Sequence, residues 1–212
     1  GGRARLRVAA DGARLRSRRI GATPQGYATG EVADSADFLE SPRYATILGA
    51  AKLTGRTSSG MSIGALAAVT QREYANLYDM TTNSFEKVAV EPSTAYLVGR
   101  VQQEFGASAS TVGVTLTGLS RNFSDAEPLK QQMTSQAVSG GADWLLRFNN
   151  GQFLVGGHAG FSYIHGSDTA VTAVQTSSAR YYQRPDQDYA VLDTTPTSLS
   201  VYSLGRNADK AG

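Results

Sequence analysis

Asp143 and His158 form the residue pair with the clearest potential for chemistry, because they flank the dipeptide Asn150-Gly151 at equal distances. A hairpin closed at this dipeptide would bring them opposite each other, and a carboxylate beside an imidazole can orient a general base. Ser139 and Ser162 fall near them in register, but neither lies in the sharp turn that exposes a nucleophilic serine. We therefore expect a polar pair on a strand surface and no catalysis in this chain, with a hydrolase as one alternative.

Metal and cofactor chemistry has little support in the sequence. His158 and His165 are the two histidines, they do not have the spacing of a helical metal pair, and there is no cysteine. The glycine-rich strings at 113–118 and 156–160 lack the lysine and the following helix of a phosphate loop. We expect no metal site and no cofactor.

The elements that must position these side chains are predicted to be long antiparallel strands. In the segment 137–166, Asn150-Gly151 tolerates the positive φ angles of a two-residue type I′ turn, which would place Phe148 opposite Phe153. Apolar side chains then share one face of both strands and polar or small ones share the other. Each strand could run about ten residues, the length with which a tilted strand crosses a bilayer. The pattern predicts two strands of a transmembrane β-barrel.

Two further hairpins follow the same alternation. Strands at 46–57 and 61–70 flank a short turn that places Gly60 in the left-handed region, and strands at 94–105 and 111–123 flank a loop at 106–110. The expected pairs of the first are Gly55 with Ile63, Leu53 with Ala65, and Ala51 with Ala67.

This phase assignment gives two sets of candidate residues. The lipid-facing candidates are Leu53, Ile63, Leu97, Val101, Val112, Val114, Leu116, Trp144, Leu146, Phe148, Phe153, Val155 and Phe161. The polar candidates, expected to face a lumen, are Lys52, Arg56, Arg100, Glu104, Asp143, Arg147 and His158. The polar set would either set the electric field in a passage or bind a plug, or else form salt bridges that only fill the interior.

The remaining segments read as connections or incomplete strands. A first hairpin is expected at 3–21 around Asp11-Gly12, a long loop at 22–45, and an outward extension with a polar loop at 71–92. A mostly polar segment follows at 166–196, and a last strand is expected to start at 197–204. We count about eight or nine strands in one β-barrel region spanning 1–212, incomplete at both ends.

Composition narrows the possible partners. The 212 residues carry a net charge of only +2 and no apolar run of about 18 residues, so neither a strongly basic surface nor a transmembrane helix is indicated. The arginines near the N-terminus follow a strand period and lack interleaved aromatic residues, so no nucleic-acid partner is expected.

Several distinctive strings occur in order along the chain: SRRIG at 17–21 with Pro24-Gln25, ILGAAKLTGRT at 47–57 with SIG at 62–64, VEP at 90–92 with VGRVQ at 98–102, and SSARYYQRPD at 177–186. They resemble a bacterial family, the outer-membrane β-barrels of unassigned function (domain of unknown function 5916) that follow a carbohydrate-binding family 9-like domain. The resemblance implies an outer-membrane location in a Gram-negative bacterium and no defined activity. Any contact with carbohydrate or another small solute would be made by the neighbouring domain, and the chain would be a fragment of the barrel.

The sequence therefore predicts an all-β fold, an antiparallel meander of long hairpins that forms a transmembrane β-barrel or an open section of one. The lipid bilayer is the expected partner, and transport, a pore or surface display the expected role. The alternatives are a soluble all-β binding module, whose polar strand faces meet water, and a carbohydrate-related hydrolase.

Overall fold

Antiparallel β-sheet makes up most of the computed structural model, which describes residues 5–9, 20–28, 36–124, 128–178 and 195–210. Within these residues eleven strands lie in two sheets. The large sheet contains β1 (Arg5–Ala9), β3 (Ile47–Arg56), β4 (Met61–Thr70), β7 (Ser93–Phe105), β8 (Ser110–Asn122), β9 (Gln136–Phe148), β10 (Phe153–His165) and β11 (Ser198–Lys210). The small sheet contains β2 (Phe38–Glu40), β5 (Glu73–Asp79) and β6 (Ser84–Glu91).

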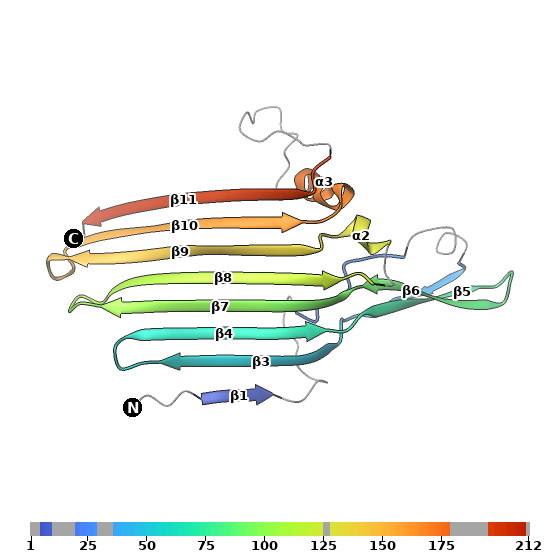
Figure 1. Cartoon of the computed structure of the whole chain (residues 1–212), viewed down its shortest axis with the longest axis horizontal. Coiled ribbons are helices and arrows are strands. Elements are labelled where there is room, and N and C mark those ends of the chain that lie inside the picture. The colour runs from blue at the N-terminus through green and yellow to red at the C-terminus, as the bar shows by residue number, and fades with distance from the viewer. Residues whose placement is uncertain (1–4, 10–19, 29–35, 125–127, 179–194, 211–212) are drawn as a thin grey trace.

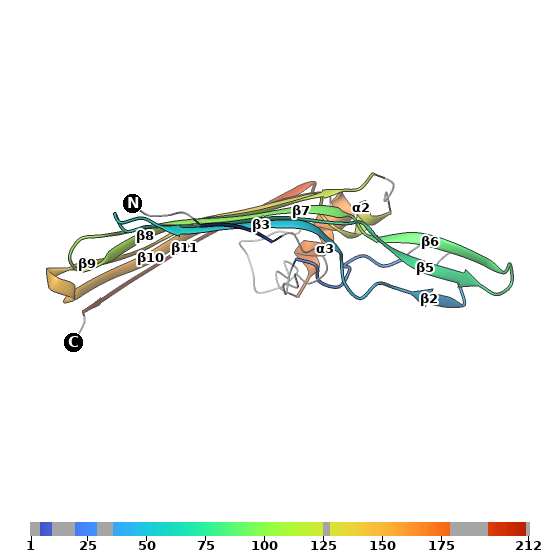
Figure 2. The ribbon, with the colours of Figure 1, turned by 90° about the horizontal axis from the view of Figure 1, so that it is seen from below.

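The eight strands of the large sheet lie side by side in the order β1-β3-β4-β7-β8-β9-β10-β11, each antiparallel to its neighbours (Figure 1). The edge-on view shows a thin, extended layer (Figure 2). The predicted all-β antiparallel meander is confirmed. The sheet is open rather than closed into a barrel, with β1 and β11 at its edges.

The tight turns fix the registers that the sequence predicts. Asn150 and Gly151 have φ angles of 55° and 89°, and the amide of Gln152 donates to the carbonyl of Asn149 at 3.1 Å, as in a type I′ turn. Asn149 also has a positive φ, 50°, so the strands are joined by the four residues 149–152 rather than by a two-residue turn. Phe148 pairs with Phe153. Gly60, with φ of 85°, closes the hairpin of β3 and β4, and its three predicted pairs all occur. The positive-φ residues of the turns therefore set which side chains share a face.

The outward extension predicted at 71–92 occurs as β5, whereas two stretches expected to be loops contain the other strands of the small sheet. Residues 71–92 are largely the strands β5 and β6, which continue β4 and β7 beyond the large sheet, and the segment 22–45 contains β2. Figure 1 shows this hairpin projecting past the large sheet. The tyrosine and charged residues of 71–92 gave this segment a polar, loop-like composition, but cross-strand pairing still stabilises it.

Two short helices were also missed. The helix α2 (Leu129–Gln132) follows β8, and α3 (Asp168–Thr176) lies in the segment 166–196 that was predicted to be irregular. Ser167 caps α3, because its hydroxyl accepts a hydrogen bond from the amide of Ala170 at 3.2 Å. No helix in the described parts of the chain is long and apolar enough to cross a membrane.

The strands at the two ends of the chain differ from those predicted. β11 starts within the predicted segment but pairs with β10 over thirteen residues, so the last strand is longer than predicted. β1 pairs with β3, whereas the turn at Asp11-Gly12 lies outside the described residues. The eleven described strands exceed the predicted eight or nine mainly because of the small sheet.

Candidate functional site: a sheet with two unlike faces

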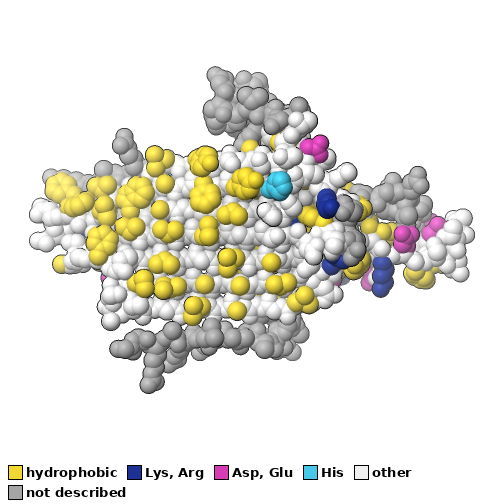
Figure 3. Space-filling model, in the orientation of Figure 1, with side chains coloured by type: hydrophobic (Ala, Val, Ile, Leu, Met, Phe, Trp, Pro, Cys, Tyr) yellow, Lys and Arg dark blue, Asp and Glu magenta, His cyan; other side chains and the backbone are white. Residues whose placement is uncertain are grey.

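One face of the large sheet is apolar across its full width, and we call it the apolar face. Residues that are direct partners share a face, and the thirteen lipid-facing candidates all fall on this one. One row across seven strands contains Leu53, Ala65, Gly99, Leu116, Gly140, Phe161 and Tyr202. Among the described side chains of β3 to β11 in this sheet, none on the apolar face is Asp, Glu, Lys or Arg (Figure 3).

The apolar face is uncovered. Leu97 is 53% exposed, Val114 54% and Phe148 51%, so large side chains are open along the whole strand length. Soluble monomers rarely expose so continuous an apolar surface, which usually marks contact with a membrane or another protein. That these residues meet lipid stays a prediction.

The opposite face, which we call the polar face, carries all seven polar candidates. One row runs from Arg56 on β3 through Gln102 and Gly113 to Asp143 on β9 and His158 on β10. Lys52 and Arg100 lie in nearby rows of this face, and Glu104 and Arg147 lie nearer the short turns. That this face lines a lumen stays a prediction.

The central feature of the polar face is an ion pair that reaches over a strand. The Arg100 guanidinium on β7 donates to both carboxylate oxygens of Asp143 on β9, at 2.7 and 2.9 Å. β8 lies between them, and there Gly113 leaves the space, since a Cβ at this position would stand 2.7 Å from Arg100 Nη2. Arg100 also donates to Thr115 Oγ1 at 2.7 Å and to Gln102 Oε1 at 3.1 Å. The guanidinium is thus fixed by three strands.

This pair changes the interpretation of Asp143 and His158. The two are opposite each other in register, as predicted, but the carboxylate binds Arg100, and the His158 ring lies over Gly205 on β11. The opposed positions of the predicted polar pair are therefore confirmed, but the carboxylate of Asp143 accepts its described hydrogen bonds from Arg100. The nearby Ser139 hydroxyl shares a hydrogen bond of 2.6 Å with Thr117 Oγ1, which is a structural contact between strands.

The other charged candidates occupy separate positions. Arg56 forms a 3.1 Å ion pair with Glu104, again across an intervening strand, while Lys52 is exposed. Arg147 donates from its guanidinium to the carbonyl of Ala109 in the turn between β7 and β8.

A polar cluster around the buried Glu91, at the rim of the polar face, was not predicted. The amide of Gln25 donates to Glu91 Oε2 at 2.8 Å, and Arg121 donates to Gln25 Oε1 at 3.1 Å and to the carbonyl of Thr134 at 2.7 Å. Burial raises the pKa of Glu91, although the Gln25 hydrogen bond and the Arg121 charge oppose the shift. Gln25 and Glu91 both lie in strings that resemble the family, but nothing in those strings indicates that the two residues are in contact.

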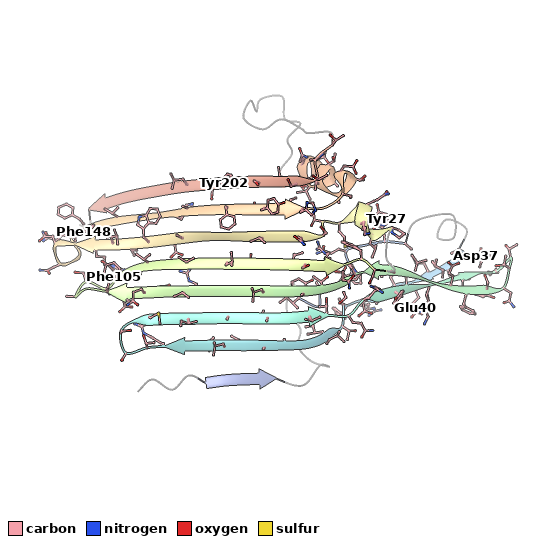
Figure 4. All side chains as sticks on the ribbon, in the orientation of Figure 1. Tyr27, Asp37, Glu40, Phe105, Phe148 and Tyr202 are labelled. Carbon is pink, nitrogen blue, oxygen red and sulfur yellow. The ribbon has the colours of Figure 1, made fainter. Side chains whose placement is uncertain are left out.

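The cluster fixes one segment of chain onto the sheet. Gly26 donates its amide to the carbonyl of Val90 at 3.0 Å, and a Cβ at Gly26 would lie 2.5 Å from that oxygen and 2.6 Å from Leu129. Tyr27 exchanges two hydrogen bonds of 3.0 Å with the Gln132 side chain (Figure 4). Residues 20–27 therefore approach the sheet so closely that only glycine fits at position 26.

A groove of about 900 Å³ opens between this segment and the strands. Ile20 and Gln25 form one side, and Tyr96, Arg121 and a row of hydroxyls belong to the polar face. The row consists of Thr117, Ser139 and Ser162 on three adjacent strands. The lining suits a ligand with both apolar and hydrogen-bonding parts. Within the described residues no group of three or more His, Asp or Glu could hold a metal ion.

These features define a class of protein: an antiparallel β-sheet with one polar face and one face on which the described side chains of β3 to β11 include no Asp, Glu, Lys or Arg. The chain belongs to the family described as a domain of unknown function (DUF5916), whose model matches residues 11–181. Comparison with curated proteins and with solved structures gives no significant match.

Proposed function

We propose that this chain forms part of the wall of a transmembrane β-barrel in the bacterial outer membrane, with the polar face lining a passage for solutes and no catalysis in the chain. The observation that carries the proposal is the sorting of side chains by face. Charge is absent from the described apolar face and concentrated on the other, the alternation expected between lipid and an aqueous interior.

The dimensions of the apolar face support this assignment. Along β9 it extends from Val138 to Phe148, eleven residues, whose ten steps span about 33 Å at the usual rise of a strand. A strand tilted by about 40° would then cover roughly 25 Å of membrane thickness, the height of the apolar band of outer-membrane barrels. Phe105, Phe148 and Phe153 lie at one rim of the band and Tyr163 at the other, as aromatic girdles do (Figure 4).

The open edges require further pairing in this environment. Backbone groups at an unpaired strand edge cost several kcal/mol each in hydrocarbon, so an open sheet is not a stable membrane structure. We propose that additional strands pair with β1 and β11 and close the barrel.

The lengths of the connections indicate the orientation. Short turns at 57–60, 106–109 and 149–152 lie at one end of the sheet, and the small sheet and both helices lie at the other (Figure 1). Outer-membrane barrels have short periplasmic turns and longer extracellular connections. We therefore propose that the small sheet is on the cell surface.

Fractionation and labelling test the proposal. The protein is expected in the outer-membrane fraction and to need detergent for extraction. Because the chain has no cysteine, single-cysteine variants are clean probes. A membrane-impermeant maleimide should label Thr81→Cys at the tip of the small sheet on intact cells, and Ser58→Cys in a short turn only after the cells are opened. Labelling of Ser58→Cys but not of Thr81→Cys on intact cells would indicate the opposite orientation.

The alternative, a soluble all-β binding module, makes the opposite prediction. Its apolar face would be covered by another domain, and the protein would remain in solution without detergent after the cells are broken. Recovery of monodisperse protein in plain buffer would reject the membrane assignment in favour of this alternative.

A further inference from the structure

The charges on the polar face are unequal in number. The described side chains of the large sheet include five basic residues, Lys52, Arg56, Arg100, Arg121 and Arg147, and two acidic ones, Glu104 and Asp143. All seven lie on the polar face. The excess is therefore concentrated where the proposed passage runs.

Ion pairing leaves two of these charges uncompensated. Arg56 pairs with Glu104 at 3.1 Å and Arg100 with Asp143 at 2.7 Å. Arg121 is attracted by the buried Glu91 of the small sheet. Within the described chain no carboxylate lies within ion-pair distance of the two remaining cations, Lys52 in the middle of β3 and Arg147 near the short turns.

We propose that the polar face presents a net positive field and that the passage it lines favours small anions over cations. The inference rests on the proposed function, because the field acts on solutes only if this face encloses a passage. Basic side chains lining a pore lower the energy of an entering anion and raise that of a cation. Lys52 and Arg147 lie at two different heights along the strands, so an anion would meet positive charge at two levels.

The test measures ion selectivity of the closed barrel, purified with the strands that we propose to pair with β1 and β11, in a planar lipid bilayer under a KCl gradient. The wild-type reversal potential should have the sign of chloride permeation, and Lys52→Gln/Arg147→Gln should move it toward zero. Lys87→Gln is the control for the single variant Lys52→Gln, since each removes one positive charge and Lys87 lies on the exposed small sheet; it should leave the reversal potential unchanged. Selectivity should weaken at high salt, because the Debye length falls from about 10 Å at 0.1 M to about 3 Å at 1 M.

The outcomes separate this inference from the proposed function. A conductance that favours potassium, or one whose selectivity is the same in the double variant, would overturn the anion preference and leave the passage intact. Absence of any conductance would reject the passage and the preference together. The single variant Lys52→Gln guards against misfolding, since Lys52 is exposed and its loss leaves no buried group unpaired; it should give part of the shift.

Discussion

Placing an arginine in the middle of the apolar face tests most sharply whether that face lies in lipid. Val114 is 54% exposed and pairs with Ala142, near the centre of the band between Phe148 and Val138. At the bilayer midplane of a β-barrel an arginine costs about 2–4 kcal/mol, so Val114→Arg should lower the free energy of unfolding by that amount. In water the same surface change would cost roughly 0.5 kcal/mol or less.

Two matched variants separate membrane depth from other effects of arginine. Val155→Arg lies on the same face near the short-turn rim, where the expected cost falls to about 0–1 kcal/mol. Val98→Arg lies on the polar face, where valine is 38% exposed, and should cost about 0.5 kcal/mol or less.

The assay is guanidinium unfolding of protein refolded into lipid vesicles, followed by the emission of Trp144, the single tryptophan of the chain. The expected order of destabilisation is Val114→Arg, then Val155→Arg, then Val98→Arg. Equal costs for the Val114 and Val98 variants would refute the assignment of the apolar face to lipid.

Three further predictions concern the polar face and its rim. Gly113→Ala should break the Arg100–Asp143 pair, because it places a Cβ 2.7 Å from the guanidinium. The two side chains are 42% and 46% exposed, so the free energy of unfolding should fall by about 1 kcal/mol or less. In a double-mutant cycle, Asp143→Asn should remove most of the effect of Gly113→Ala. Gly26→Ala should destabilise the folded protein by about 1–3 kcal/mol, because the added Cβ crowds Val90 and Leu129. The unfolding midpoint should fall and proteolysis within 20–28 should become faster. An unchanged cleavage pattern would contradict the close packing. Burial raises the pKa of Glu91, so the folded state keeps a proton on this carboxyl at a pH where the unfolded chain has lost it. Wild-type stability relative to Glu91→Gln should therefore fall as pH rises from the ordinary glutamate pKa through the raised one, and a flat difference would contradict this shift.

The faces and registers of the large sheet were predictable because they depend on local signals. Alternation with a period of two assigns each side chain to a face once the register is known, and Gly60 and Gly151 fix that register in their hairpins. The apolar and polar sets therefore follow from short stretches of sequence.

The contacts that cross intervening strands could not be predicted in the same way. The partner of Asp143 is Arg100, two strands away, and the choice depends on strand order and on the space left by Gly113. The rim cluster joins Gln25 to Glu91, 66 residues apart in sequence, which no local pattern reports. In the small sheet, β5 corresponds to the predicted outward extension, whereas β2 and β6 were missed because their polar, exposed segments have the composition of a loop.

Quenching of Trp144 fluorescence by brominated lipids tests the central claim most directly. The indole belongs to the apolar face and lies over Gly157 near the middle of the proposed band. If this face meets hydrocarbon, lipids brominated in their acyl chains should quench its emission strongly, and a water-soluble quencher such as iodide should have little effect. Strong quenching by iodide with none by the brominated lipids would contradict the account.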